Sequence, residues 1–580
     1  MNDSLAWKVL LLSLLLPLAA CQRGDSTVGK SGEEAASLEA RPCWFEVDNS
    51  WPVTQCFMME VPENHADPEG RKIRFPVVRF IANEKNPDKF PLLHLGAGGP
   101  GASMGLEPEN ASEWLWINYA TMTVENGRDL IVIDPRGTGM AEPRLSCAEF
   151  IEDASAAYQR PLTADEEARV FTFSLERCYS RLSSEADLAQ YNSSAVARDV
   201  EALRKALGLE KLNLYGVSYA SRYALTLARD FPESVHALVL NSAVFPDIPY
   251  IQQLAGDSLA AYKRGINFCS KEKHCASRYP NLRQRLENLV AQLDQTPVTV
   301  SIEHPFADAE FPFVMTGQRL LRVLFQALYD EGFYPELPAV IEGLEKGDPA
   351  PAREAVSSFM AIILDPYFGD AAGISHFCYE EAPFVDFHEA RLQAEETGIL
   401  GSAVRKDLEV MQLQCRIWAI PPAGRLEAEP ISAPAPALIL HGALDPVLNA
   451  KDAERARKAL PNHQWLLFPK LAHDVISASN CAEYAAARFL DAPDADATEG
   501  VQQCRADEIK AQQVPAQRQG ESDSNEDSAL PATPQQAPQE TPEQATERYS
   551  TADSSEDYSG NPPEAFTETP AATWLPLGGI

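Results

Sequence analysis

Short apolar runs recur along the chain, each bounded by turn residues, and they constrain its fold more than any other feature. They occupy residues 92–95, 130–133, 212–215 and 237–240 and resume at 437–440 and 465–468, while residues 74–81 before them indicate a further strand. Such runs are typical of parallel strands buried on both faces. A helical pattern lies between two of them, with Ser193 as its expected cap and Gly208 as its expected end. Strands alternating with helices predict an α/β fold with a mostly parallel sheet, in which Pro76 indicates an edge strand.

The same pattern divides the chain of 580 residues into segments. Strand-like runs become rare after residue 245 and resume near 433, so the intervening part is predicted to be a largely helical cap insertion. The last segment is rich in Gln, Pro, Ser, Thr and Glu, a composition that does not bury a core. The predicted segments are 1–20 (signal peptide), 21–42 (linker), 43–245 (first part of the core), 246–432 (cap), 433–504 (second part of the core) and 505–580 (disordered tail).

The net charge of −35, from 84 acidic and 49 basic residues, argues against a nucleic-acid partner. Binding phosphates requires a basic surface, and so does electrostatic docking on anionic lipid. The charge identifies no substrate.

The amino-terminal segment has the features of an export signal. An apolar run from Val9 to Ala20 has the length of a signal-peptide core and is short for a bilayer span. Its end, Leu18-Ala19-Ala20-Cys21, resembles a bacterial lipobox, which implies lipidation of Cys21. Gln22 then favours the outer membrane, facing the periplasm, as the location in the cell envelope. Simple cleavage after Ala20 and an uncleaved anchor remain alternatives.

The cysteine count agrees with export. Removing Cys21 from the eleven cysteines leaves ten, and no CxxC motif indicates a zinc ribbon or a thioredoxin-type site. Neighbours along the chain suggest five pairs, as a hypothesis that an oxidising compartment would permit. These pairs are Cys43 with Cys56, Cys147 with Cys178, Cys269 with Cys275, Cys378 with Cys415, and Cys481 with Cys504.

A candidate nucleophile lies between a predicted strand and a predicted helix. The sequence Gly216-Val217-Ser218-Tyr219-Ala220 resembles the Gly-x-Ser-x-Gly elbow, which exposes a serine at the carboxyl end of the sheet. Small residues on both sides of the serine let the helix and the strand approach closely. Taken alone, the pattern usually marks only a loop serine, and its strand–turn–helix context favours Ser218 as a nucleophile.

A glycine-rich loop, residues 96–101, follows another predicted strand. Backbone N–H groups of Gly98 or Gly99, together with that of Tyr219, are the expected oxyanion donors. A structural turn or a phosphate loop is the alternative, but a Walker-type loop would need Gly-Lys-Ser/Thr at its end.

An acid and a base follow the last two predicted strands. Asp445 lies just past one strand and His473 just past the next, which gives the triad order Ser, Asp, His. His463 precedes its strand and so lies at the wrong end of the sheet. A turn aspartate and a structural histidine are the alternatives for each residue alone. Together with Ser218 they predict acyl transfer that requires neither a metal nor an organic cofactor.

These stretches together resemble the prolyl aminopeptidase and tripeptidyl aminopeptidase family of α/β-hydrolases. The marks are Gly98-Gly99-Pro100-Gly101, Asp134-Pro135-Arg136-Gly137-Thr138-Gly139 and Gly216-Val217-Ser218-Tyr219. Two departures are Ala97, in place of the family's histidine, and Ala220, in place of its second elbow glycine. The resemblance implies an α/β-hydrolase fold with a cap and a peptide as substrate.

Aminopeptidases of this family bind the free amine of the substrate with carboxylates from the cap. Glu380, in the acidic pair Glu380-Glu381 beside Cys378, is the candidate for this role here. A solvated acidic turn is the alternative interpretation.

Two other functions remain open at this stage. One is an esterase or amidase that uses the same triad, since this fold hosts many chemistries. The other is a catalytically silent envelope lipoprotein that uses the scaffold for binding. The complete set of Ser218, Asp445 and His473 argues against the second.

Overall fold

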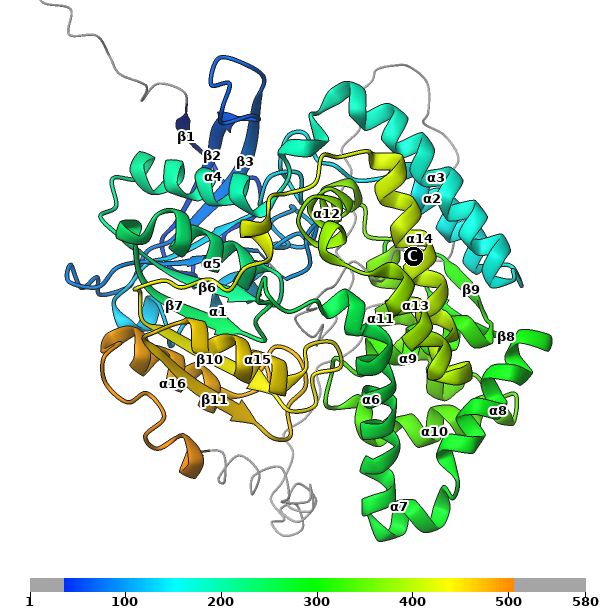
Figure 1. The fold of residues 1–580 in the computed structure, drawn as a ribbon. Coiled ribbons are helices and arrows are strands. Elements are labelled where there is room, and N and C mark those ends of the chain that lie inside the picture. The colour runs from blue at the N-terminus through cyan, green and yellow to red at the C-terminus, as the bar shows by residue number, and fades with distance from the viewer. Residues whose placement is uncertain (1–35, 97, 505–580) are drawn as a thin grey trace, which may run out of the picture.

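A computed structural model describes residues 36–96 and 98–504 (Figure 1). The predicted signal peptide, the predicted lipidation site Cys21, the departure Ala97 and the tail from residue 505 lie outside the described residues. Within the described part of the chain, no helix is both long enough and apolar enough to cross a membrane.

Nine strands of the described chain form one sheet. In spatial order they are β1 (Ser37–Arg41), β2 (Thr54–Pro62), β3 (Lys72–Phe80), β5 (Leu130–Ile133), β4 (Leu92–His94), β6 (Leu212–Val217), β7 (Val235–Asn241), β10 (Ala437–Gly442) and β11 (His463–Phe468). From β5 to β11 all neighbours are parallel, and β1, β2 and β3 add an antiparallel edge. The predicted mostly parallel sheet is therefore confirmed.

The prediction that Pro76 marks an edge strand is wrong, because β3 lies between β2 and β5. The β5 ladder contacts only Val77–Phe80 of β3. On the same side, the Arg74 N–H donates to the Glu142 carbonyl outside that ladder. Pro76 thus occupies a gap between two neighbours, where its missing N–H costs no sheet hydrogen bond.

Side chains that alternate along the strands build a core on each face of the sheet. One core contains Leu93, Leu214 and Leu240 and packs against α4 (Ser193–Ala206) and α5 (Ala220–Asp230). The other core includes Val132 and Val239 and packs against α1 (Trp114–Ile117) and α16 (Asn480–Asp491). The sheet is therefore the middle of three layers.

The predicted capping of α4 by Ser193 is wrong by one residue. The Asn192 side chain accepts the Ala195 N–H (3.0 Å), and Ser193 is the first residue of the helix. The Ser193 hydroxyl instead donates to Glu380 (2.5 Å), a partner that the local sequence does not reveal. Gly208 follows the end of the helix at φ +65°, the left-handed conformation that glycine permits.

A layer of helices separates β7 from β10 along the chain and lies beside the sheet (Figure 1). It consists of α6 (Tyr250–Lys271), α7 (Lys273–Arg278), α8 (Leu282–Gln295), α9 (Gly317–Ala327), α10 (Phe333–Glu345), α11 (Arg353–Ile363), α12 (Asp370–His376), α13 (Phe387–Glu396) and α14 (Ser402–Trp418), with a hairpin of β8 (Val298–Glu303) and β9 (Glu310–Met315). We call this layer the cap.

Helices α2 (Ala148–Tyr158) and α3 (Ala164–Glu185) lie against the cap, although they precede it in the chain (Figure 1). A buried ion pair joins Glu167 of α3 to Arg319 of α9 (2.7 Å), and Arg322 bridges Glu167 to Asp407 of α14. Between β10 and β11 lies the short helix α15 (Ala450–Ala456).

All five suggested cysteine pairs are disulfides in the structure. Each closes a segment of at most 37 residues in sequence separation. Two of them, Cys269–Cys275 and Cys378–Cys415, lie within the cap.

Candidate active site

Ser218 lies on the tight turn between β6 and α5. Its φ is +53°, a conformation that non-glycine residues rarely adopt. A Cβ at Gly216 would lie 2.6 Å from Ser221 Cα, so only glycine allows this approach of strand and helix. Ala220, the departure from the family pattern, is a fully buried first residue of α5. The sequence thus forms the predicted strand–turn–helix elbow.

Asp445 and His473 meet at the carboxyl ends of the neighbouring strands β10 and β11. His473 Nδ1 lies 2.7 Å from Asp445 Oδ2. The other oxygen, Asp445 Oδ1, accepts the N–H groups of Val447 (3.0 Å) and Leu448 (2.9 Å). Burial opposes ionisation of Asp445, but the charge and hydrogen bond of His473 outweigh it and hold the pKa of Asp445 below its usual value. An ionised aspartate paired with Nδ1 leaves Nε2 as the working nitrogen of the base.

The two atoms that would exchange the proton are both buried and uncommitted. Neither Ser218 Oγ nor His473 Nε2 has a hydrogen-bond partner among the described residues, so they are not bonded to each other. Catalytic hydrogen bonds are often long in the absence of substrate and tighten when it binds. The structure therefore contains a formed Asp445–His473 pair and a Ser218 hydroxyl that has no partner among the described residues.

The glycine-rich loop lies beside the elbow because β4 and β6 are parallel neighbours, with His94 opposite Tyr215. Gly98 and Gly101 both adopt positive φ, +128° and +119°. Gly99 closes the turn by accepting the Ala102 N–H (3.0 Å). Tyr219 is the N-cap of α5, where N–H groups lack partners within the helix and favour an anion. The residues predicted to donate hydrogen bonds to an oxyanion, Gly98, Gly99 and Tyr219, therefore follow neighbouring strands at the same edge of the sheet.

The second family mark, residues 134–139, supports the glycine-rich loop rather than the reaction. Asp134 is fully buried and accepts the N–H groups of Met104 (2.7 Å) and Met140 (2.8 Å). Arg136 forms a buried bidentate pair with Asp199 of α4, at 2.7 and 2.6 Å. Through these contacts, residues 134–139 connect the loop after β5 to the loop after β4 and to α4.

Glu380 faces the elbow from a π-helical turn of the cap, Phe377–Glu381. It is 1% exposed and accepts hydrogen bonds from the Ser193 hydroxyl, the Ser193 N–H (3.1 Å) and the Tyr219 hydroxyl (2.8 Å). Glu381 is 6% exposed and pairs with Arg222 of α5 (2.5 Å). The interpretation of this pair as a solvated turn is wrong. Contact of Glu380 with a substrate amine stays a prediction, and its oxygens already have three internal donors.

The cap also contacts the acid and the base, through residues that the sequence did not single out. The Tyr329 carbonyl accepts the His473 N–H (3.2 Å), and the two rings lie edge to face at 5.0 Å. Arg264 of α6 donates to the Asp445 carbonyl (2.6 Å). Tyr334 of α10 donates to the Leu444 carbonyl (2.7 Å). These contacts join residues more than 100 positions apart, for which no local pattern exists.

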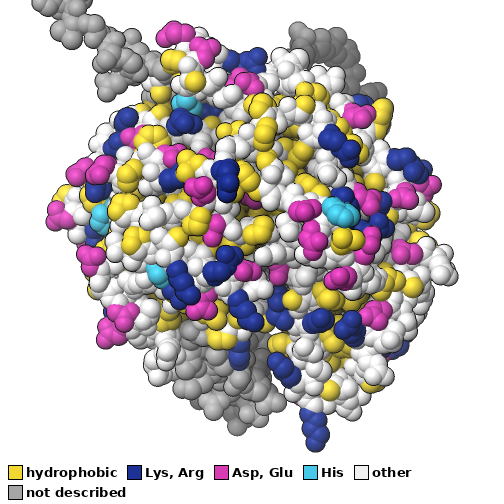
Figure 2. Space-filling model, viewed as in Figure 1, with side chains coloured by type: hydrophobic (Ala, Val, Ile, Leu, Met, Phe, Trp, Pro, Cys, Tyr) yellow, Lys and Arg dark blue, Asp and Glu magenta, His cyan; other side chains and the backbone are white. Residues whose placement is uncertain are grey.

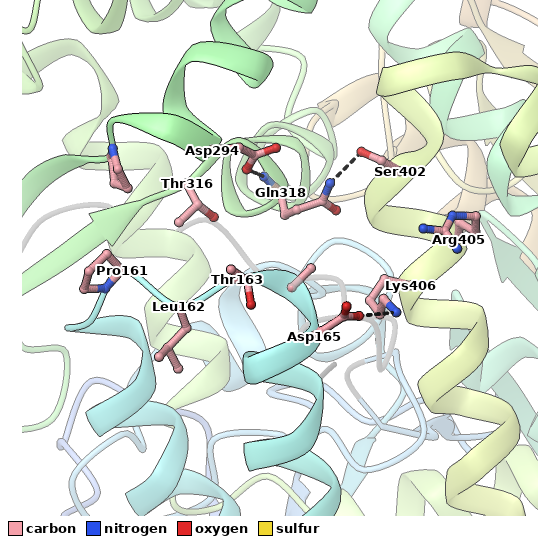
Figure 3. Close-up of a pocket in the computed structure, with 12 residues that line it drawn as sticks. Pro161, Leu162, Thr163, Asp165, Asp294, Thr316, Gln318, Ser402, Arg405 and Lys406 are labelled. Atoms are coloured by element: carbon pink, nitrogen blue, oxygen red, sulfur yellow. Dashed lines mark hydrogen bonds and ion pairs between the residues drawn. The ribbon is translucent and has the colours of Figure 1, made fainter.

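A pocket of about 300 Å³ lies between the start of α3 and the cap, and none of the predicted site residues lines it (Figure 3). The starts of α3, α9 and α14 line it. Gln318 donates to Ser402 (2.7 Å) and Lys406 pairs with Asp165 (2.7 Å). Its polar groups largely satisfy one another.

Charged side chains of both signs are interspersed over the face drawn in Figure 2. Among the described residues, no group of three or more His, Cys, Asp or Glu is arranged to hold a metal ion.

Two family models match the chain. The model described as alpha/beta hydrolase fold matches residues 97–300, and the model described as TAP-like protein matches residues 402–504. The first match includes the glycine-rich loop and Ser218, and the second includes Asp445 and His473.

Curated relatives include the tripeptidyl aminopeptidase of Streptomyces lividans, 30% identical over 36% of this chain and 39% of that protein. Serine protease Hip1 of Mycobacterium tuberculosis is 30% identical over 34% of this chain and 37% of that protein. The matched part thus spans about two fifths of these relatives.

Among solved structures, the proline iminopeptidase of Mycobacterium smegmatis is 14% identical, with a TM-score of 0.30, over 78% of this chain and 99% of that one. A likeness at this level carries no argument about the reaction. The matched models, the strand order and the elbow serine show that the chain has the α/β-hydrolase fold.

Proposed function

We propose that the protein is a serine exopeptidase that releases amino-terminal residues or short peptides from peptide substrates. The observation that carries the proposal is the buried pair of Asp445 with His473. This pair follows strands β10 and β11, at the same carboxyl-terminal edge of the sheet as the elbow serine Ser218. The partial similarity to a tripeptidyl aminopeptidase and to serine protease Hip1 supports a peptide as substrate. Prolyl or tripeptidyl preference is part of the proposal.

In the proposed mechanism, Ser218 Oγ attacks the substrate carbonyl while His473 Nε2 takes the hydroxyl proton. Asp445 holds the imidazole in the tautomer that leaves Nε2 free and stabilises the imidazolium. Backbone N–H groups of Gly98 or Gly99 and of Tyr219 hold the oxyanion. His473 then gives its proton to the leaving amine. Water, deprotonated by the same histidine, releases the acyl group and regenerates the Ser218 hydroxyl.

An esterase or amidase is the second candidate, because one observation favours it. The Glu380 carboxylate is enclosed by Ser193 and Tyr219, so binding an ammonium group there would displace an internal donor. An esterase needs no acceptor for an amine.

Hydrolysis of chromogenic alanyl, prolyl and Ala-Ala-Pro amides, each with a free and an acetylated amine, separates the two candidates. We expect cleavage of the free-amine forms alone, and its loss in Ser218→Ala. Equal cleavage of both forms would favour the amidase or esterase and remove the role of Glu380. Ser221→Ala, three residues along the same elbow, is a control for general disturbance of the turn. A folded protein that cleaves no amide or ester would contradict both candidates and leave a silent scaffold.

We also propose export and attachment to the cell envelope through a lipid on Cys21, with the outer membrane as the destination. The five disulfides support an oxidising compartment. Expression of the chain and of Cys21→Ala in bacteria tests this. The unchanged chain is expected in the membrane fraction and the variant in the soluble periplasmic fraction. Equal distribution of the two would contradict lipid attachment at Cys21.

A further inference from the structure

A buried network of hydrogen bonds lies next to two residues of the candidate triad, Ser218 and His473. It joins Asn241, the last residue of β7, to Asp474, the residue after His473. The Asn241 amide donates to Asp474 Oδ1 (2.5 Å) and to the Tyr215 hydroxyl (2.9 Å). Its oxygen accepts the Val475 N–H (3.1 Å). Every polar atom of this asparagine side chain is therefore directed at the histidine loop or at the strand of the nucleophile.

Asn241 also holds the nucleophile. Its backbone carbonyl accepts the Ser218 N–H at 2.9 Å, directly at the elbow. One residue thus binds the serine through its main chain and the segment after His473 through its side chain. Because Asn241 ends a central strand and is fully buried, it has little freedom to follow either loop.

The backbone at Asp474 requires such support. Its φ is +56°, a left-handed conformation that is unfavourable for a residue with a side chain. Asp474 Oδ1 accepts hydrogen bonds from the Asn241 amide (2.5 Å) and the Ser477 N–H (3.3 Å), and Oδ2 accepts one from the Ser477 hydroxyl (2.7 Å). The turn that presents His473 is therefore fixed by hydrogen bonds of the next residue.

Asp474 adds a second buried carboxylate to the loop that carries His473. It is 6% exposed, and no Lys or Arg of the described chain forms an ion pair with it. Burial raises its pKa, while hydrogen bonds from Ser477 and Asn241 and the nearby His473 act in the opposite direction. A charge that forms on His473 during acyl transfer would thus be stabilised by Asp445, which contacts the ring, and by the electrostatic interaction with the Asp474 carboxylate.

We propose that Asn241 and Asp474 act as a positioning pair for the triad. Asn241 fixes the His473 loop in register with Ser218, and the Asp474 carboxylate stabilises the protonated base. Neither residue touches the reacting atoms. Asn241 acts through the positions of Ser218 and His473, and Asp474 acts through His473. The inference rests on the proposed serine chemistry and specifies how its base is aligned.

Asn241→Ala tests the alignment, with Asn213→Ala as its matched control. Asn213 is an equally buried asparagine of a central strand, at the opposite end of the sheet, where it donates to the Phe90 carbonyl (2.8 Å) and contacts His236 (2.9 Å). Each variant would be assayed for thermal stability, for covalent labelling of Ser218 by a fluorophosphonate, and for kcat and KM. We expect Asn241→Ala to lose about 10–100-fold in labelling rate and kcat with KM within about threefold, since misplacement of a reacting group acts on the chemical step. Asn213→Ala should lose stability alone.

Asp474→Asn tests the charge and also serves if Asn241→Ala does not fold. The amide oxygen of the new asparagine can still accept the Asn241 hydrogen bond, so kcat of Asp474→Asn at high pH should stay within about threefold of the unchanged protein. Asp474→Ala cannot accept this bond, and its kcat should stay low even at high pH. The titratable groups around His473 are Asp445 and His441 from β10 and its loop, Tyr329 and Glu331 from the cap, and Asp474 itself. Asp474→Asn removes one negative charge from this set. The acid limb of kcat/KM should therefore move to lower pH by about 0.5–1 unit, because the protonated base is less stabilised.

Equal labelling of Asn241→Ala and the unchanged protein, or an unmoved acid limb in Asp474→Asn, would overturn the inference alone. If the unchanged, folded protein is not labelled at Ser218, the proposed function fails and this inference fails with it.

Discussion

Single buried charges hold the loops of the candidate site, and each has its partner in a distant segment. Arg136 follows β5 and pairs with Asp199 of α4 across 63 positions of sequence. His65 also contacts Asp199 (2.8 Å). Charge and hydrogen bonds from Arg136 and His65 outweigh burial and lower the pKa of Asp199. Such a group stays ionised in the interior only while its partner remains.

Arg136→Met should therefore lower the free energy of unfolding by about 3–5 kcal/mol, because it leaves the Asp199 charge buried without its guanidinium. The double variant Arg136→Met/Asp199→Leu should recover part of that loss, since no unpaired charge remains. Urea unfolding of the two single variants and the double variant gives the coupling energy. Additive losses in this cycle would show that the pair contributes no interaction of its own.

A second buried carboxyl near the glycine-rich loop, that of Asp134, forms no ion pair with any Lys or Arg of residues 36–96 and 98–504. Burial raises the pKa of Asp134 to about 7, and the neighbouring Glu107 adds to the increase. The ordinary value is 3.8, so between about pH 4 and pH 7 the unfolded chain releases this proton before the folded one does. The stability that Asp134 contributes is thus present below pH 4 and lost as the pH rises through 7.

Glu107→Gln should weaken this pH dependence, because it removes the charge that disfavours ionisation of Asp134. Between pH 5 and pH 8 the unfolding free energy of the variant should fall by about 1 kcal/mol less than that of the unchanged protein, as expected for one pKa unit. Urea unfolding at the two pH values measures the difference. Glu109→Gln, at an exposed position of the same loop, should behave like the unchanged protein. A parallel fall in all three proteins would disprove the assignment.

At the scale of elements, the sequence predicted what depends on local pattern. The apolar runs predicted the parallel strands, and the positions of Asp445 and His473 at strand ends predicted their contact, while the role of Ser218 stays a prediction. The sequence did not show that Asn192, and not Ser193, caps α4, because both residues are good caps. The contacts of the cap with the loops that carry Asp445 and His473 could not be predicted for another reason: they depend on packing between segments far apart in sequence.

The disulfide Cys378–Cys415 fixes the π-helical turn of Glu380 to α14 and closes a segment of 37 residues. Replacing both cysteines by serine should lower the unfolding free energy by about 4 kcal/mol. It should also lower kcat, since Glu380 holds the Tyr219 hydroxyl beside the nucleophile. The matched control is the Cys269–Cys275 pair, with a separation of 6, whose removal should cost about 2 kcal/mol and leave kcat unchanged. Equal effects of the two double variants on kcat would contradict this reasoning.

Over the whole molecule, the cap and the sheet share one continuous core. Leu214 and Leu240 of the sheet belong to the same cluster of buried side chains as Leu324 and Ile341 of the cap. The cap therefore has no apolar core that is separate from that of the sheet face it covers.

Cap and sheet should therefore unfold in a single cooperative transition. Loss of near-ultraviolet circular dichroism, loss of Ser218 labelling and the calorimetric peak are expected at the same temperature, with calorimetric and van't Hoff enthalpies in agreement. Loss of labelling well before the calorimetric peak would instead indicate that the cap opens independently of the sheet.

The order of the five disulfides has a consequence for how the chain reaches its covalent structure. From Cys43 to Cys504, each cysteine is bonded to its immediate neighbour in the series, and no two bridges interleave. A chain that meets an oxidant progressively from its amino end would complete every bridge before the first cysteine of the next one arrived. Pairing in order of appearance then yields the native connectivity, and a catalyst that only introduces disulfides would suffice without one that rearranges them.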